Sequence, residues 1–346
     1  MSKNLKLGKK TALLLTGKTD RLYYSGINLD EGIVVKTDKS VTLFTDARYF
    51  GAYQSQAESN GVDLRLYKGY SDLKAFFKEN KIKKVFLNYN VTTVSELINI
   101  KKQGVLVSNG ASLIAKDREI KSDKELSLIL KGCEITFKAL EKTLPKIKAG
   151  VTEKQIATLI EKEMMSLGAE GTAFDSIVAF GVNSAIPHHE TGDTVLKENQ
   201  VVLIDIGAKY KGYSADLTRT YFYGKPDDTF IERYNAVLTA NEKVEKEISV
   251  GILGKRADAI AREYLKGQNL DKYFTHSLGH GLGLDIHESP TLSPKGETPL
   301  SNDMAFTIEP GVYFDNEYGI RIEDTVYLSN GTLFRAYTDD KGLKTL

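Results

Sequence analysis

An apolar stretch of the chain, Val201–Ala208, carries Asp205 in its middle. Burying an unpaired carboxylate is costly, so an acid inside such a strand requires a compensating group. The next stretch, Tyr213–Tyr221, contains a second acid, Asp216. We predict a β-hairpin with its turn centred on Tyr210-Lys211, which sets Asp205 directly opposite Asp216 on one face of the sheet.

A second pair of acids repeats this arrangement towards the C-terminus. The strand Ala305–Glu309 ends just before a proline, which favours an extended backbone at Glu309. The return strand, Gly319–Val326, contains Glu323. Symmetry of the hairpin about Asn316 sets Glu309 opposite Glu323.

Carboxylates that face each other across two strands repel, so each pair requires compensation. Protonation can supply it, as can an arginine partner such as Arg219 or Arg321. Metal ions are the third answer, because four carboxylates offset two divalent cations and hard oxygen ligands suit Mn, Co, Fe(II) or Zn. One such hairpin alone fits a solvated face, whereas two in matching places favour a metal centre.

The histidines support this interpretation, because the chain has only five and they occupy two short segments. Surface histidines would be scattered, so the clustering favours a functional site. One of them, His280, lies between two glycines that allow close approach of the backbone to a bound group, and we predict that it is the nitrogen ligand. His276 fits a role in orienting a neighbour. The five are His188, His189, His276, His280 and His287.

The chain is long enough for two domains at 346 residues, and its 41% hydrophobic and 27% charged residues are typical of a globular protein. Short β-rich runs alternate with helices over residues 1–121 and predict an α/β layer. A capping box at Ser122 and Glu125 opens the second part. Over residues 122–346 we predict two halves, each with two helices followed by a hairpin.

The net charge of the chain is only +1, so its charge does not indicate nucleic acid or an anionic membrane as a binding partner. No apolar run is long enough to span a bilayer, and the N-terminal apolar run is shorter than that of a secretory signal. We therefore expect a cytoplasmic protein.

In their order and context, five of these residues resemble the metal ligands of the pita-bread metallopeptidases. The segments His276–Glu288 and Thr307–Thr325 are similar to the proline-directed branch, which contains aminopeptidase P and prolidase. Residues 1–120 resemble the N-terminal domain of that branch through Tyr23–Ile27 and Thr45–Tyr49. The resemblance implies an α+β fold, with a pita-bread (creatinase/aminopeptidase) catalytic domain over 122–346 and a smaller creatinase-like α/β domain over 1–121. The five residues are Asp205, Asp216, His280, Glu309 and Glu323.

The resemblance also implies two divalent metal ions per chain, bridged by a hydroxide, with manganese first and cobalt, zinc or iron as alternatives. Asp216 and Glu323 would bridge the ions. Asp205 would complete the coordination of one ion, and His280 and Glu309 that of the other.

Further roles follow from the same resemblance. Glu309 would take the proton from the attacking water. His188 and His287 would donate hydrogen bonds to the substrate or to the tetrahedral intermediate. Arg321 would lie near the proline pocket with His276. The alternative role of Arg321 is an ion pair with a carboxylate such as Glu323. Because His189 stands where the family has a small residue, the choice between His188 and His189 stays open.

The function implied first is an Xaa-Pro aminopeptidase, which cleaves between an N-terminal residue and proline. The nearest alternative is prolidase, which cleaves only Xaa-Pro dipeptides and would use Arg321 to capture the carboxylate. Methionine aminopeptidase shares the fold and the ligands, but that assignment would not account for residues 1–120. Creatinase and non-catalytic peptide-binding modules lack the ligands. The expected partners are peptides with proline in second position and a second copy of the chain in a homodimer.

Overall fold

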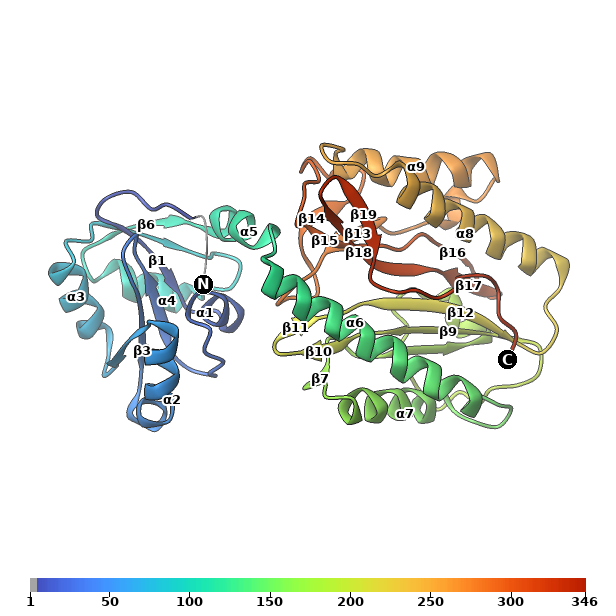
Figure 1. The fold of residues 1–346 in the computed structure, drawn as a ribbon, viewed down its shortest axis with the longest axis horizontal. Coiled ribbons are helices and arrows are strands. Elements are labelled where there is room, and N and C mark those ends of the chain that lie inside the picture. Colours follow the sequence, from blue (N-terminus) through green and yellow to red (C-terminus); the bar gives the residue numbers. More distant parts are fainter. Residues whose placement is uncertain (1–4) are drawn as a thin grey trace. The chain divides into compact units, whose positions relative to one another are not determined.

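The structure is a computed structural model that describes residues 5–346. Its chain divides into two compact units, one ending at Arg118 and the other running from Glu119 to Leu346 (Figure 1). Each unit has hydrophobic cores of its own. Within the described range, no helix combines the length and the hydropathy that crossing a membrane requires.

The N-terminal unit is a six-stranded sheet with helices packed on it. Its strands lie in the order β4 (Asp63–Leu66), β3 (Val41–Thr45), β2 (Ile33–Lys36), β1 (Thr11–Leu15), β5 (Lys84–Leu87) and β6 (Leu106–Asn109). The helices are α1 (Lys18–Ser25), α2 (Ala47–Asn60), α3 (Tyr70–Glu79), α4 (Val94–Lys101) and α5 (Ala111–Glu119). Asp46 caps α2, because its side chain accepts a hydrogen bond from the amide of Arg48.

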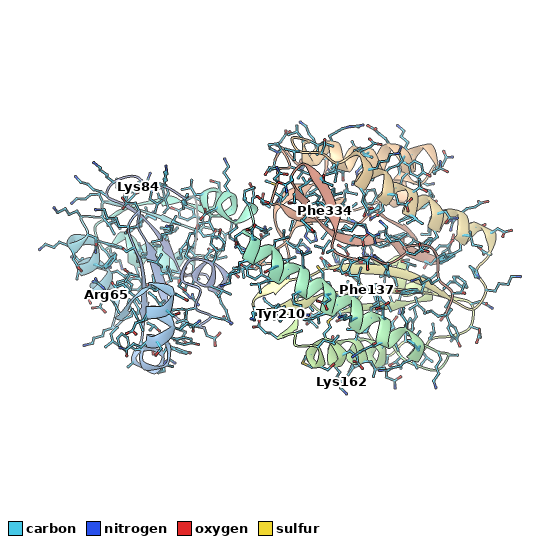
Figure 2. All side chains as sticks on the ribbon, in the orientation of Figure 1. Arg65, Lys84, Phe137, Lys162, Tyr210 and Phe334 are labelled. Carbon is cyan, nitrogen blue, oxygen red and sulfur yellow. The ribbon has the colours of Figure 1, made fainter. Side chains whose placement is uncertain are left out.

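Two pairs of long helices build the outer layer of the C-terminal unit. They are α6 (Asp123–Thr143), α7 (Glu153–Ser166), α8 (Asp228–Glu247) and α9 (Gly254–Gly267). The capping box predicted at Ser122 and Glu125 opens α6, and a second box, formed by Thr152 and Gln155, opens α7. Along α7, Ile156 and Ile160 are buried, whereas Lys162 points away from the core (Figure 2). This spacing is the amphipathic pattern of a helix that covers a sheet.

The sheet under these helices combines strands from both halves of the unit. Its order is β14 (Glu288–Leu292), β13 (Gly279–Gly281), β15 (Ala305–Ile308), β18 (Glu323–Ser329), β12 (Leu217–Tyr223), β9 (Gln200–Ile206) and β8 (Ile177–Phe180), and β19 (Thr332–Arg335) pairs with β18. The central pair, β18 and β12, joins the halves through Thr218 opposite Glu323. The acids of the two predicted hairpins therefore meet at the middle of one sheet.

Strand alternation decides which side chains face the helices. Ile204 and Ile206 of β9 lie in the core that includes α6 and α7, and Phe306 and Ile308 of β15 lie in the core that includes α8 and α9. Successive side chains point to opposite faces of a strand, so Asp205 lies on the face turned away from the helices. The candidate site thus occupies the face that the helices leave open.

The register of the C-terminal hairpin is as predicted, but that of the first hairpin is not. In the C-terminal hairpin, Ile308 pairs with Asp324 and Gly311 with Arg321, so Glu309 and Glu323 occupy opposed positions across the interruption. The interrupted strands continue as β16 (Gly311–Phe314) and β17 (Tyr318–Arg321).

In the first hairpin, Asp205 pairs with Thr218 instead of Asp216, so the predicted direct opposition is wrong. The reason is the turn. It consists of Lys211 and Gly212, both with positive φ (47° and 83°), between β10 (Ala208–Tyr210) and β11 (Tyr213–Ser214). Such two-residue turns match the twist of the strands. Asp216 therefore lies diagonally from Asp205 on the same face.

Candidate metal centre

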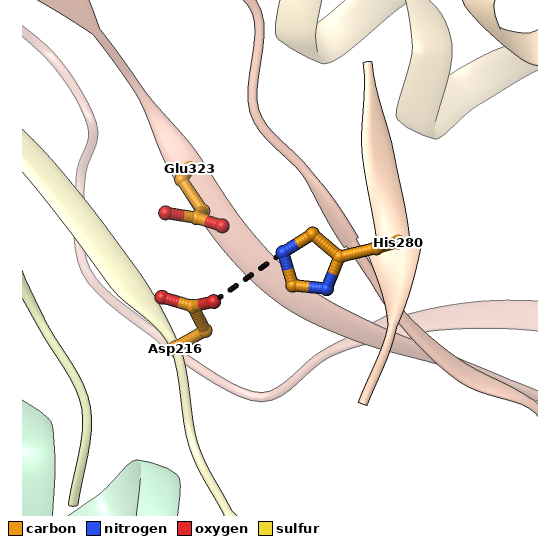
Figure 3. Close-up of side chains that lie close together, drawn as sticks. All are labelled: Asp216, His280 and Glu323. Atoms are coloured by element: carbon orange, nitrogen blue, oxygen red, sulfur yellow. Dashed lines mark ion pairs between the residues drawn. The ribbon is translucent and has the colours of Figure 1, made fainter. Parts of the chain in front are cut away.

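Three ligand-type side chains converge where the two halves of the sheet meet. Asp216 precedes β12, Glu323 opens β18 and His280 lies on β13. One ligand atom from each lies within 4.8 Å of the others (Figure 3). The fourth group is Glu309, whose Oε1 lies 3.4 Å from His280 Nε2. Residues more than a hundred positions apart in the chain therefore form one cluster.

The ring of His280 is oriented for coordination through Nε2. Its Nδ1 lies 3.1 Å from the carbonyl oxygen of Gly281, to which it donates a hydrogen bond. Nε2 then has a free lone pair, and it faces Asp216 Oδ2 at 3.6 Å. Burial lowers the pKa of His280 to about 4, and the nearby His287 adds to the effect. A neutral imidazole with its other nitrogen anchored is the form that binds a divalent metal.

The carboxylates of the cluster are buried together. Burial raises the pKa of Glu309 to about 8, with Arg321 lowering it and Asp205 raising it further. Burial also raises the pKa of Asp216 and of Glu323 well above the ordinary range, and their acidic neighbours add to both shifts. Buried acids this close are stable as anions only beside strong positive charge. The donor set of oxygens and one imidazole fits divalent manganese, iron, cobalt or zinc.

Asp205 is held by an arginine on one oxygen only. Arg321 Nη2 donates to its Oδ2 at 2.6 Å. Its other oxygen, Oδ1, is buried and has no hydrogen-bond partner among the described residues. A buried carboxylate oxygen without a donor is costly unless a cation takes that place. This orphan oxygen is a second observation that fits a metal at the site.

Arg321 also anchors a chain of hydrogen bonds behind the carboxylates. Its Nη1 donates to the Tyr313 hydroxyl at 2.7 Å, and that hydroxyl lies 2.9 Å from His276 Nε2. His276 Nδ1 lies 2.8 Å from the Ser277 carbonyl oxygen. Burial lowers the pKa of His276 to about 3, so the ring is neutral and its Nε2 accepts a hydrogen bond from the Tyr313 hydroxyl. The other candidate arginine, Arg219, pairs instead with Asp324 and Asp339.

The cluster opens into a cavity of about 450 Å³. His188, His276 and His287 line it together with the ligand-type residues and Arg321. The rings of His287 and His280 meet edge to face, with centroids 4.3 Å apart. Apolar side chains complete the wall; they are Phe174, Ile177, Pro187 and Ile286. The five predicted metal ligands, His188, His276, His287 and Arg321 thus line a single cavity.

His189 lies elsewhere, since its Nε2 is 2.9 Å from Glu153 Oε2 and its side chain is only 12% exposed. Of the two adjacent histidines, His188 is therefore the one that lines the cavity.

Two threonines that hydrogen-bond to the carboxylates were not among the residues predicted to form the site. Thr218 donates to Glu323 Oε2 at 2.7 Å, and Thr307 donates to Glu309 Oε1 at 3.2 Å. Strand alternation places both threonines on the ligand face, which is a usable signal. For Tyr313 and Glu153 the sequence offers no comparable signal, because their partners come from distant segments.

Sequence comparisons match both parts of the chain to known families. Residues 127–330 match metallopeptidase family M24, and residues 3–120 match the creatinase/prolidase N-terminal domain. The Xaa-Pro dipeptidase of Pyrococcus horikoshii is 35% identical over 329 residues, which cover 92% of this chain and 91% of that protein.

Solved structures give the same result. The Xaa-Pro dipeptidase from Bacillus anthracis is similar with a TM-score of 0.92 and 33% identity, over 97% of this chain and 95% of that one. The X-Pro aminopeptidase from Thermotoga maritima has a TM-score of 0.89 and 33% identity, with the same coverage. These neighbours confirm the predicted pita-bread fold with a creatinase-type N-terminal domain.

Proposed function

Because this chain belongs to metallopeptidase family M24, we propose that it is an Xaa-Pro dipeptidase. At the level of the family it is a metal-dependent hydrolase that acts on Xaa-Pro bonds. The observation that supports catalysis in this chain is the convergence of Asp216, His280 and Glu323 within 4.8 Å in a cavity. A cluster of buried acids costs stability unless a cation compensates the charge, and such clusters with shifted pKa values in a cavity are typical of functional sites.

The proposed metal-binding residues are the five predicted from the sequence. When bound, two divalent ions lower the pKa of a water molecule and polarise the scissile carbonyl. Manganese is the proposed metal, with cobalt, zinc or iron as alternatives. Asp216, His280 and Glu323 would hold metal at the centre of the cluster, where their ligand atoms lie within 4.8 Å of one another. The full set is Asp205, Asp216, His280, Glu309 and Glu323.

Glu309 has a second proposed role in proton transfer, and four residues outside the metal-binding set are proposed to orient the substrate. Glu309 accepts the proton of the attacking water and returns it to the proline nitrogen as that nitrogen leaves. His188 and His287 donate hydrogen bonds to the carbonyl oxygen as negative charge develops on it. Arg321 and His276 lie on the cavity wall and are proposed to bind the proline end of the substrate.

An Xaa-Pro aminopeptidase was the function expected first, whereas the relatives favour the alternative, an Xaa-Pro dipeptidase. Proteins named Xaa-Pro dipeptidase match nearly the whole chain, both in sequence and in structure. A structure named X-Pro aminopeptidase is also similar, so the fold alone does not discriminate. We therefore propose the dipeptidase on the strength of the sequence relatives.

Paired substrates test this proposal. Protein loaded with Mn²⁺ is given an Xaa-Pro dipeptide and the matching Xaa-Pro-Xaa tripeptide, and release of the first residue is measured. We expect cleavage of the dipeptide alone. Equal cleavage of the tripeptide would restore the aminopeptidase, and cleavage of neither would reject both functions.

We also propose that the enzyme is a cytoplasmic homodimer that contains manganese. Metal analysis of the protein purified without added metal tests the last point. Light scattering at micromolar concentration tests the dimer, which would be wrong if the mass corresponded to a single chain of 38.4 kDa.

A further inference from the structure

The segment that carries His188 is closed at both ends by one carboxylate. This segment, residues 180–192, is called the His188 loop; it leaves β8 at Phe180 and includes the 3-10 turn η2 (Gly181–Ala185). Glu153 Oε1 accepts hydrogen bonds from Phe180 N and Asn183 Nδ2, both at 2.8 Å. Its Oε2 accepts from Gly192 N at 3.1 Å and lies 2.9 Å from His189 Nε2. Each oxygen thus binds one end of the loop.

The side chain of Glu153 is 0% exposed. An ionised carboxylate in that position is stable only if its lone pairs are filled, and here four donors fill them. Glu153 is also the first residue of α7, where the helix dipole favours a negative charge. The anion and the closed conformation of the loop therefore stabilise each other.

His188 is fixed from both of its neighbours. The carbonyl oxygen of Pro187 accepts a hydrogen bond from Arg321 Nη1 at 3.4 Å, and His189 is bound to Glu153. The amide of His189 donates to the Ile186 carbonyl oxygen at 3.1 Å. Adjacent histidines thus point to different environments, one into the cavity and the other to the buried acid.

We propose that Glu153 and His189 are positioning residues that hold His188 in its place for the reaction. The proposal rests on the proposed function, since the role of His188 belongs to it. A misplacement of about 1 Å can cost a factor of about a hundred in rate. His189 supplies one of the four donors that contact Glu153. We expect its loss to loosen one end of the His188 loop without unfolding α7.

The kinetic test compares His189→Ala with His189→Gln on an Xaa-Pro dipeptide. We expect kcat/KM to fall about tenfold in the alanine variant, since a hydrogen bond to a charged group is lost. The glutamine variant can still donate to Glu153 and should recover at least about a third of the wild-type value. Glu163→Gln, which alters an exposed salt bridge near the other end of α7, is the matched control and should change kcat/KM less than about twofold.

A double-mutant cycle separates positioning from general destabilisation. If His189 acts through His188, then His189→Ala should have no further effect in a His188→Ala background. Additive losses would overturn the proposal. Metal content should stay at the wild-type level in all of these variants.

Hydrogen–deuterium exchange gives a readout that needs no activity. In His189→Ala and in Glu153→Gln, amides of residues 180–192 should exchange faster, with the rest of the C-terminal unit unchanged. Unchanged exchange in the loop of His189→Ala would overturn the proposal even in an active enzyme. Faster exchange in a protein without dipeptidase activity would support the loop assignment and reject the proposed function instead.

Discussion

Glu309 is a largely buried carboxylic acid beside the proposed nitrogen ligand. Its Oε1 lies 3.4 Å from His280 Nε2, and burial raises its pKa to about 8. We expect Glu309→Gln to lose at least about a hundredfold in kcat, because the amide can neither accept the proton nor bind metal as an anion. The unfolding midpoint of the metal-free protein should change by only a few degrees, since Gln has nearly the same shape.

Steady-state kinetics and thermal unfolding check this prediction. Glu317→Gln is a suitable control, because Glu317 is an exposed partner of Arg233. Activity of Glu309→Gln within about threefold of wild type would remove Glu309 from the catalytic assignment.

His276 gives the protein a pH-dependent stability. Its pKa is about 3 in the folded protein, mainly because of burial and then because of Arg321, against about 6.5 in an unfolded chain. Between these values the unfolded chain binds a proton that the folded protein excludes. The free energy of unfolding therefore falls as the pH drops below about 6.5.

The difference between wild type and His276→Asn isolates this contribution. From pH 7 to pH 5, metal-free wild type should lose about 1 kcal/mol more than the variant, after allowance for the partial exposure of the ring. Denaturant titrations at both pH values measure it. Equal losses in the two proteins would show that His276 is not held neutral.

At the residue scale, the ligand-type residues could be predicted from the sequence, but the residues that hold the cavity-lining segments in place could not. Asp205 and Glu323 stand out because acids are rare inside apolar strands. Tyr313 and Glu153 give no such local signal, since tyrosine is common in strands and a glutamate is ordinary in a first helical turn. Only the packed structure shows that each is bound to a cavity-lining segment.

At the scale of elements, the two hairpins differ in how far their turns could be predicted. Asn316 has a φ of 60° at the centre of the C-terminal turn, and the predicted symmetry holds there. In the first hairpin, a turn centred one residue later than predicted moved the pairing by two residues. Even shifts keep side chains on the same face, so the face of Asp205 was predicted correctly although its partner was not.

Gly207 lies between the two aspartates of the first hairpin. A Cβ at this position would lie 1.9 Å from the Ala215 carbonyl oxygen and 2.8 Å from the Phe174 ring. We expect Gly207→Ala to lower the free energy of unfolding by at least about 2 kcal/mol, because backbone on the adjoining strand must move. Mn²⁺ affinity should fall as well, since the displacement separates Asp205 from Asp216.

Gly267→Ala is the matched control for this variant. Gly267 ends α9, and a Cβ there would meet nothing within 4 Å. Its substitution should leave stability unchanged or raise it by up to about 1 kcal/mol. Denaturant unfolding and calorimetric titration with Mn²⁺ measure both variants, and a tolerated Gly207→Ala would contradict the steric argument.

At the scale of the whole molecule, the candidate metal site belongs to one of the two units. The residues of the Asp216, His280 and Glu323 group all lie beyond Glu119. Among residues 5–118, no comparable group of ligand-type side chains is brought together. The two units also have separate hydrophobic cores. The predicted division into domains of 1–121 and 122–346 can therefore be tested through the metal.

Differential scanning calorimetry with and without Mn²⁺ makes that test. A ligand that binds only the folded state stabilises it by about 2.7 kcal/mol at a hundredfold excess over its Kd. For a unit of this size, such a gain raises the unfolding temperature by about 5–10 °C. Removal of metal with EDTA should reverse the gain, because the buried carboxylates then lose their compensating charge.

Because the candidate metal site lies in the C-terminal unit, only the unfolding transition of that unit should respond to metal. We expect two transitions, of which only the one that belongs to the C-terminal unit responds to Mn²⁺ and EDTA, since only that unit holds the cluster. Glu323→Gln should abolish the response while leaving the other transition in place. A single transition that shifts as a whole would mean that the two units unfold as one cooperative body, and no shift at all would mean that the opposed carboxylates are compensated by protons and by Arg321 instead of by metal.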